Sequence, residues 1–331
     1  MGFDLVSTYR FVKRNGLGKF VAVVLGAWLV SACATHQPTH RHAFELAGDP
    51  ASPLVVVADY DKTYNRIGRV EAKRLNSGNV DLYVNPDRAA VYVDRKSFVG
   101  ASGTTYTNHY YRLHFQRVPY SIVPFYITAG RNGGLFIIVT VDQSARPVLI
   151  TTVHTCGCYL AFVPTSALAE DALPRDWPRD RQSVYGESLP ASLALPNDPS
   201  KGRIAVYLRH GTHRVSDVRV LSAAELGALT RHSAIPLPIE SLNKIAIDEG
   251  ETVSLFYESG SRRGYVKYAF KPWELLLMSW WALDPFIGQD KKLGDPAETG
   301  TIFYTSLKPW NRAASNLWPF ENFLRFWGWR M

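Results

Sequence analysis

Residues 54–165 consist largely of alternating or wholly apolar segments separated by short turns. A period of two is typical of β-strands, and Asn132-Gly133 is typical of a tight turn between them. YYRLHFQRV (110–118) alternates polar and apolar residues, whereas GLFIIVTVD (134–142) is apolar on both faces. The pattern predicts a mainly β fold, either an antiparallel β sandwich or a curled, partly closed barrel, with a few short helices toward the carboxyl terminus.

The turn sequences suggest which strands are paired as hairpins. We expect segments 80–84 and 89–94 to pair across NPDR, and segments 121–128 and 134–142 to pair across AGRNG. Segment 146–163 should return beside 134–142 after DQSA. Further hairpins are expected at 203–221 and 251–270, and SAAELGALT (222–230) has the capping-box pattern of a short helix.

The amino-terminal region contains an apolar run that ends near a cysteine. FVAVVLGAWLV (Phe20–Val30) has 11 residues, whereas about 20 are needed to span a bilayer. A run of this length after a basic region is typical of a signal peptide. The basic residues are Arg10, Lys13, Arg14 and Lys19. VSAC (Val30–Cys33) resembles the bacterial lipobox, in which a branched aliphatic residue and two small residues precede cysteine.

The lipobox resemblance implies cleavage before Cys33 and attachment of fatty acids, such as palmitate, to its sulfur and new amino terminus. Ala34 follows instead of aspartate, which in this class implies sorting to the outer membrane. We therefore expect a lipid-anchored protein that faces the periplasm, an oxidising compartment. A plain signal peptide or an uncleaved anchor is the alternative. The expected periplasmic location excludes nucleic acid as a partner class and favours an envelope protein or glycan.

Composition agrees with a folded domain. Aromatic residues make up 13% of the chain and charged residues 20%, which favours a globular structure over disorder. The net charge is +8, spread without a long basic run, as expected of a solvated surface. We divide the chain into a signal peptide (1–32), a lipidated cysteine with a polar tether (33–53), an antiparallel β domain (54–165), a proline-rich connecting segment (166–201) and a region of hairpins with a tryptophan-rich helical end (202–331).

The carboxyl-terminal region is unusually rich in tryptophan. PWELLLMSWWAL (272–283) predicts a helix with Pro272 near its start. Interleaved leucines favour packing of this helix against the sheet, and the alternative is a surface for glycans or the membrane interface. The histidines of RHGTHR (209–214) are expected at the surface of a hairpin turn, and those of the tether in solvent.

HTCGC (154–158) is the main candidate for chemistry. In an extended strand His154, Cys156 and Cys158 share one face, and their Cα atoms are spaced by about 6.6 Å. That spacing is too long for a relaxed disulfide. A disulfide or a shared metal ion therefore requires a bend in the chain between the cysteines, which Gly157 permits. Three interpretations remain open. The cysteines form a redox-active disulfide tuned by His154, or the three residues bind Cu or Zn with His109 or His114 as a fourth ligand, or all three are packed in the core.

PLVVVADYDKT (53–63) resembles the DxDxT motif of haloacid-dehalogenase-like phosphotransferases. The resemblance implies Asp59 as the nucleophile, Asp61 as the general acid and base, and a bound magnesium ion. That family has a parallel sheet with crossover helices, whereas hairpins follow here, and a polar turn after an edge strand is the competing interpretation.

From the sequence we expect a non-catalytic binding or scaffolding lipoprotein. The alternative function is thiol-redox or metal handling at His154, Cys156 and Cys158. A remote alternative is phosphotransfer at Asp59 and Asp61.

Overall fold

The computed structural model describes residues 41–331 except residues 50, 248 and 249. Cys33 and the predicted signal peptide lie outside the described residues. The fold is mainly β, with 39% of residues in strands and 16% in helices, which confirms the predicted class. None of the helices in the described part of the chain is long and apolar enough to cross a membrane.

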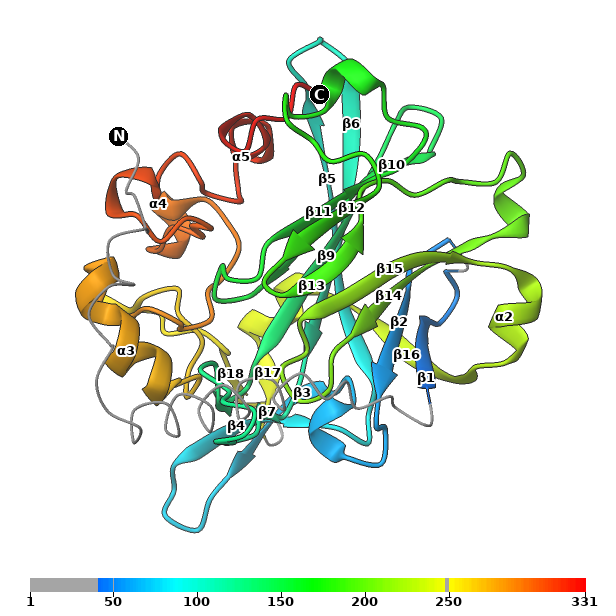
Figure 1. Ribbon diagram of the computed structural model, residues 1–331. Helices are drawn as coiled ribbons and strands as arrows, with labels where there is room; N and C mark the ends of the chain where they lie inside the picture. The colour runs from blue at the N-terminus through cyan, green and yellow to red at the C-terminus, as the bar shows by residue number, and fades with distance from the viewer. Residues whose placement is uncertain (1–40, 50, 248–249) are drawn as a thin grey trace, which may run out of the picture.

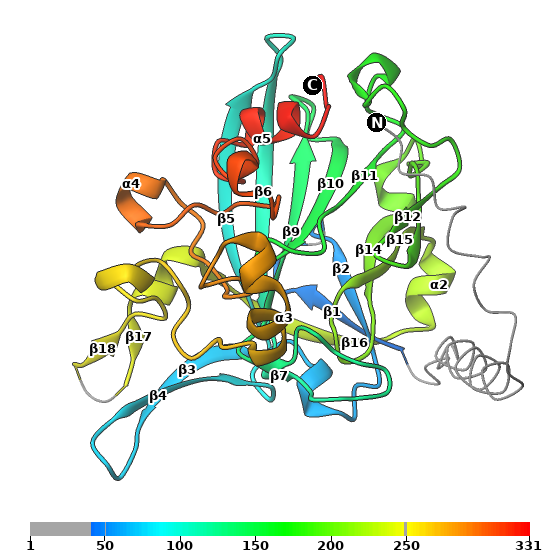
Figure 2. The same ribbon diagram turned by 60° about the vertical axis from the view of Figure 1, so that its left-hand side comes forward.

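A single ten-stranded sheet forms the body of the protein, in the order β11-β10-β9-β6-β5-β16-β1-β2-β14-β15 (Figures 1 and 2). Its strands are β1 (Arg41–Leu46), β2 (Leu54–Ala58), β5 (Ala90–Val99), β6 (Thr105–His114), β9 (Gly134–Val141), β10 (Pro147–His154), β11 (Ala161–Pro164), β14 (Arg203–Leu208), β15 (Val215–Leu221) and β16 (Thr230–Pro238).

The sheet is mixed, although antiparallel pairs predominate. The predicted pairings across DQSA and across the 209–214 turn are present as β9–β10 and β14–β15. Three pairs are parallel, namely β1–β16, β2–β14 and β5–β16. These parallel pairs join strands that are far apart in sequence, which hairpin patterns alone cannot show.

The hairpin of β12 (Arg181–Val184) and β13 (Glu187–Pro190) lies between the two ends of the sheet. β13 lies against β15, and the side-chain amide of Gln182 donates a hydrogen bond to the carbonyl oxygen of Phe162 on β11 at 2.6 Å. The sheet is therefore nearly closed, as the barrel alternative of the prediction required.

The sheet buries apolar side chains on both faces. The inner face contributes a core from nearly every strand, including Phe44, Val55, Leu113, Ile137, Ile150 and Val206. On the outer face, Phe136, Ile138 and Val153 pack against helix α5 (Phe320–Phe326). This double burial explains why GLFIIVTVD has no polar face.

The remaining elements surround the sheet. Short strands form further pairs: β3 (Arg69–Arg74), β4 (Val80–Asn85), β7 (Arg117–Val118), β8 (Gly130–Arg131), β17 (Ile245–Ala246) and β18 (Thr252–Val253). The other α-helices are α2 (Ala223–Gly227), α3 (Pro272–Ala282) and α4 (Pro296–Thr299). The 3-10 turns are η1 (Thr63–Asn65), η2 (Glu170–Ala172), η3 (Pro199–Lys201), η4 (Ile239–Asn243), η5 (Gly260–Arg262) and η6 (Pro309–Asn311). Ser222 caps α2 through the predicted capping box.

Two predicted hairpins are wrong. β4 pairs with β3 and β5 pairs with β6, so NPDR connects strands of different sheets. Segment 121–128 is an irregular loop with only an isolated bridge between Ile122 and Phe125. Pro119 and Pro124 explain this loop, because proline lacks the amide donor that a strand ladder needs.

The predicted segment boundaries also need correction. The expected tether contains β1, which enters the sheet because Ala43, Phe44 and Leu46 are buried. Residues 166–201 do not separate two domains, since β14, β15 and β16 belong to the same sheet as β5, β6 and β9.

Candidate functional site

Cys156 and Cys158 are joined by a disulfide in the turn that follows β10. Their Cα atoms are 5.6 Å apart, closer than in an extended strand. The turn is closed by hydrogen bonds from the amide of Gly157 to the carbonyl of His154 at 2.7 Å and from the amide of His154 to the carbonyl of Cys158 at 2.9 Å. Cys156 is buried, and Cys158 is partly exposed.

Gly157 provides the bend that the sequence required. Its φ of +92° lies in the region that favours glycine. A Cβ atom here would stand 2.0 Å from the carbonyl oxygen of Tyr304. Both the backbone angle and the close approach therefore restrict this position to glycine.

His154 is buried beside this turn. Its ring meets that of Tyr159 edge-on with 4.8 Å between centroids, and its Nε2 atom has no hydrogen-bond partner. Burial, together with the positive charge of Lys271, lowers the pKa of His154 well below the usual range. The imidazole is therefore neutral at physiological pH, and a metal is a possible partner for its Nε2 atom.

The ligand atoms of His154, Cys156 and Cys158 lie within 4.8 Å of one another, the one group of this kind among the described residues. A disulfide sulfur is not a thiolate, so this group could bind a soft metal only after reduction. The metal interpretation stays a prediction.

Neither proposed fourth ligand reaches this cluster. His114 is paired with Gly134, next to Leu135, the partner of His154, so its side chain points to the opposite face of the sheet. His109 shares the face of His154, but it is paired with Val139, four positions farther along β9, which is about 13 Å.

The two aspartates of the DxDxT-like motif are directed to different environments. The carboxylate of Asp59 lies 2.8 Å from Nδ1 of His210. Asp61 is exposed and pairs with Lys62 at 3.3 Å. β2 lies in a mixed sheet, whereas that family has a parallel one, and the phosphotransferase prediction gains no structural support.

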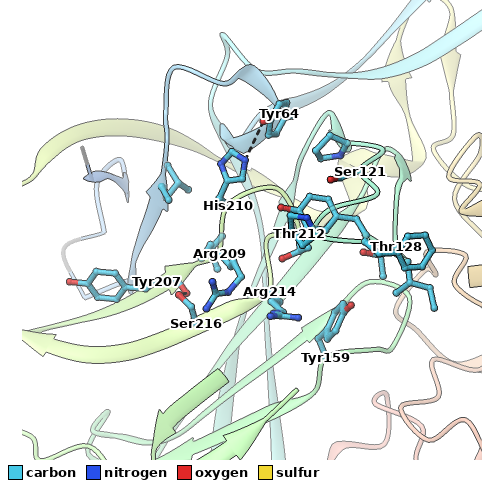
Figure 3. Close-up of a pocket in the computed structure, with 18 of the residues that line it drawn as sticks. Tyr64, Ser121, Thr128, Tyr159, Tyr207, Arg209, His210, Thr212, Arg214 and Ser216 are labelled. Atoms are coloured by element: carbon cyan, nitrogen blue, oxygen red, sulfur yellow. Dashed lines mark hydrogen bonds between the residues drawn. The ribbon is translucent and has the colours of Figure 1, made fainter. Parts of the chain in front are cut away.

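A cavity of about 890 Å³ lies between the 119–128 loop, β2 and the β14–β15 hairpin (Figure 3). Its cationic lining residues are Arg41, Arg209 and Arg214, and His210 also lines it. Its tyrosines are Tyr64, Tyr120, Tyr126, Tyr159 and Tyr207. No carboxylate is present among the described residues that line it.

Glu187, which does not line the cavity, orients the lining residues Arg209 and Arg214. Its buried carboxylate accepts hydrogen bonds from Arg209 and from Nε of Arg214, the latter at 2.7 Å. Burial alone would raise the pKa of Glu187, but the hydrogen bonds from both arginines keep the pKa below its usual value. One carboxylate thus orients two guanidinium groups, which leaves a positive balance at the cavity wall.

His210 connects the cavity wall to Asp59 through a fixed network. Its Nε2 atom lies 3.3 Å from the hydroxyl of Tyr64, as Figure 3 shows, and its Nδ1 atom lies 3.0 Å from the side-chain amide of Asn65. The Oδ1 atom of Asn65 accepts a hydrogen bond from the amide of Gly211 at 2.9 Å. The expected surface position is wrong for His213, which is buried, whereas His210 is partly exposed and lines the cavity.

Tyr159 connects the disulfide turn to the cavity, since its ring contacts that of His154 and the residue also lines the cavity.

Sequence reasoning found the disulfide turn but missed the cavity. Its one signal was the set of cations that flank the Gly211-Thr212 turn, Arg209, His210 and Arg214. Comparisons with protein-family models, with curated proteins and with solved structures found no match for this chain.

Proposed function

We propose that this chain is a lipid-anchored lipoprotein of the outer membrane that faces the periplasm and binds an anionic, ring-bearing ligand in the cavity beside β14 and β15. An acidic sugar of the cell envelope has this chemistry. The lipobox-like VSAC segment supports the anchor and the location. The cavity supports the binding role.

The observation that carries the proposal is the lining of the cavity. Three arginines line it, no carboxylate is among the described lining residues, and Glu187 fixes two of the arginines from outside the cavity. Guanidinium groups bind carboxylates and phosphates through paired hydrogen bonds. The five tyrosines offer flat apolar faces with hydroxyl groups, which suit a sugar or aromatic ring.

Calorimetric titration of the purified protein at low salt tests this proposal. Glucuronate and glucose 6-phosphate serve as anionic probes, and glucose serves as the neutral probe. We expect at least one anion to bind and glucose not to bind. Arg214→Gln should lower the affinity about tenfold or more, because a hydrogen bond to a charged group contributes roughly 1.5–3 kcal/mol.

Arg146→Gln provides a matched control, since Arg146 is an exposed arginine that pairs with Asp142 and does not line the cavity. It should bind like the unmodified protein. The proposal fails if neither anion binds at millimolar concentration, or if Arg214→Gln binds as well as Arg146→Gln.

A second candidate function is thiol-redox exchange at Cys156 and Cys158. The disulfide and the partly exposed Cys158 favour it. A redox role requires that a small thiol reduce this disulfide reversibly in the folded protein. Exchange with glutathione buffers, followed by mass spectrometry, tests it, and a disulfide that stays closed at every ratio of reduced to oxidised glutathione contradicts it.

A further inference from the structure

Helix α3 buries its polar side and exposes its apolar side. Its fully buried side chains are Glu274 and Ala282. Leu276 is 65% exposed and Trp280 is 71% exposed. A helix on the surface of a globular domain normally buries its apolar side and exposes its polar side. The reversed arrangement of α3 suits contact with an apolar environment outside the domain.

The orientation of α3 is fixed by its contacts at both ends. Before its first turn, the ammonium group of Lys271 forms a buried ion pair with Asp290 at 3.1 Å. At its other end, Arg312 donates hydrogen bonds to the carbonyl oxygens of Ala282 and Leu283. The exposed leucines and tryptophans therefore belong to a helix that is anchored in the fold through polar contacts.

A second apolar segment lies beside α3. In the 119–128 loop Ile122 is 87% exposed and Val123 is 68% exposed. The ring of Phe125 lies 6.0 Å from that of Trp273, between centroids, and Figures 1 and 2 both place this loop next to α3. The exposed side chains of both segments form the apolar rim surface: Tyr120, Ile122, Val123, Phe125, Trp273, Leu276, Leu277, Trp280, Trp281 and Leu283.

The composition of the apolar rim surface fits a bilayer interface. Residues 119–128 contain no charged side chain, and residues 272–283 contain only Glu274, which is buried. Tryptophan and tyrosine concentrate at the headgroup level of membranes, and leucine and isoleucine insert just below it. An uncharged patch of this kind on a folded domain marks a binding surface.

The path of the chain places this surface on the side of the predicted anchor. Arg41, where the described chain begins, lines the same cavity as the 119–128 loop. Cys33 lies eight residues earlier, so a lipid on it would hold Arg41 within about 30 Å of the bilayer. Tyr120, Val123 and Phe125 are exposed and also line the cavity, so the loop forms its rim.

We propose that helix α3 and the 119–128 loop insert their apolar side chains into the phospholipid interface, so that the rim of the cavity lies at the lipid headgroups. This inference rests on the proposed lipid anchor for the nearness of a bilayer. In this proposal the lipid on Cys33 attaches the protein to the membrane, and the apolar rim surface sets the orientation of the domain on the bilayer.

Tryptophan quenching by brominated phospholipids tests the inference. The full lipidated chain is reconstituted into phosphatidylcholine and phosphatidylglycerol vesicles whose acyl chains carry bromine, which quenches only tryptophans inserted into the bilayer. We expect strong quenching. The double variant Leu276→Glu with Leu277→Glu keeps every tryptophan and places two charges on the exposed face, so most of the quenching should be lost.

Val99→Glu is the matched control. Val99 is also an exposed apolar residue, 54% exposed, but it ends β5 beside the carboxyl terminus and away from α3 (Figure 1). This variant should be quenched like the native chain. Circular dichroism should show the native fold in all variants, because the changed side chains are exposed.

Absence of any quenching of Trp273, Trp280 and Trp281 on vesicle-bound protein would overturn the inference. So would quenching that survives in the double glutamate variant. A detergent-solubilised dimer that the double variant dissociates, with no quenching in vesicles, would assign the surface to a second copy of the chain and also overturn it. The intact mass of the reconstituted protein reports lipidation separately, so a missing anchor and an uninserted surface are distinct results.

Discussion

The imidazole of His213 stacks face to face on the phenyl ring of Phe115, with 4.0 Å between centroids and 2° between planes. Phe115 belongs to the inner core of the sheet. His213 thus packs as an aromatic core residue, and its Nε2 atom has no partner. Burial lowers the pKa of His213 to about 3.

The burial of His213 makes the free energy of unfolding depend on pH. An unfolded histidine has a pKa near 6.5, so between pH 6.5 and about 3 the unfolded chain binds a proton that the folded chain does not. Stability therefore falls as the pH falls through this window. At pH 4.5 the loss from His213 is about 2–3 kcal/mol, and His114 and His154 act in the same direction.

Urea unfolding of His213→Phe at pH 7.5 and pH 4.5 measures this contribution. The variant keeps the stacked ring but has no proton to bind, so it should lose about 2–3 kcal/mol less than the native protein over this interval. Any cost of phenylalanine at the positive φ of 57° is the same at both pH values and cancels. Equal losses in the two proteins would show that His213 titrates normally.

Reduction should add about two mass units to the intact protein, because a disulfide is two hydrogens lighter than its thiols. Replacing both Cys156 and Cys158 with serine should lower the free energy of unfolding by about 1–2 kcal/mol, since the bridge closes a very short loop. Native mass spectrometry before and after mild reduction checks both the bridge and the metal interpretation. A stoichiometric metal adduct on the unreduced protein would contradict the disulfide.

Gly157→Ala should destabilise the protein by more than the cost of its backbone angle. Gly186 is the matched control, since its φ of +80° is similar and no atom lies within 4 Å of the position of a Cβ. Gly186→Ala should cost about 1 kcal/mol, whereas Gly157→Ala should cost several times as much because Tyr304 blocks the Cβ. Chemical denaturation compares them, and similar midpoints would contradict the close approach.

The proposed lipid anchor requires that Cys33 be acylated. A palmitate analogue fed to cells that export the protein should label the native chain, and the Cys33→Ser variant should remain unlabelled and uncleaved. The Cys156→Ser variant is a suitable control, because its lipobox is intact. Labelling of the Cys33→Ser variant would place the lipid elsewhere.

Strand content and several local features could be predicted because they depend on short-range chemistry. The apolar run of 134–142, the DQSA turn at 142–145 and the capping box of Ser222 each involve residues close in sequence. Gly157 was also predictable, because two cysteines so close together need a bend between them.

The long-range features could not be predicted in this way. The parallel pairing of β1 with β16 joins His42 to Thr230, and no periodicity encodes such a partner. The cavity depends on the same contacts, since Arg41, Tyr126 and Arg214 meet only after the sheet has curled. The exposure of α3 reversed the expected packing. Glu274, the one charged residue of the helix, lies buried near Lys271 and Lys291, and the apolar side faces outward.

The pairing of β1 with β16 has a consequence for how the chain is made. β1 leaves the ribosome long before β16, so the edge of β1 that pairs with β16 lacks that partner until residue 238 has been synthesised. Sheet closure must therefore wait for most of the polypeptide to emerge. Until then the incomplete sheet exposes unpaired strand edges, which are the sites where unfinished chains aggregate.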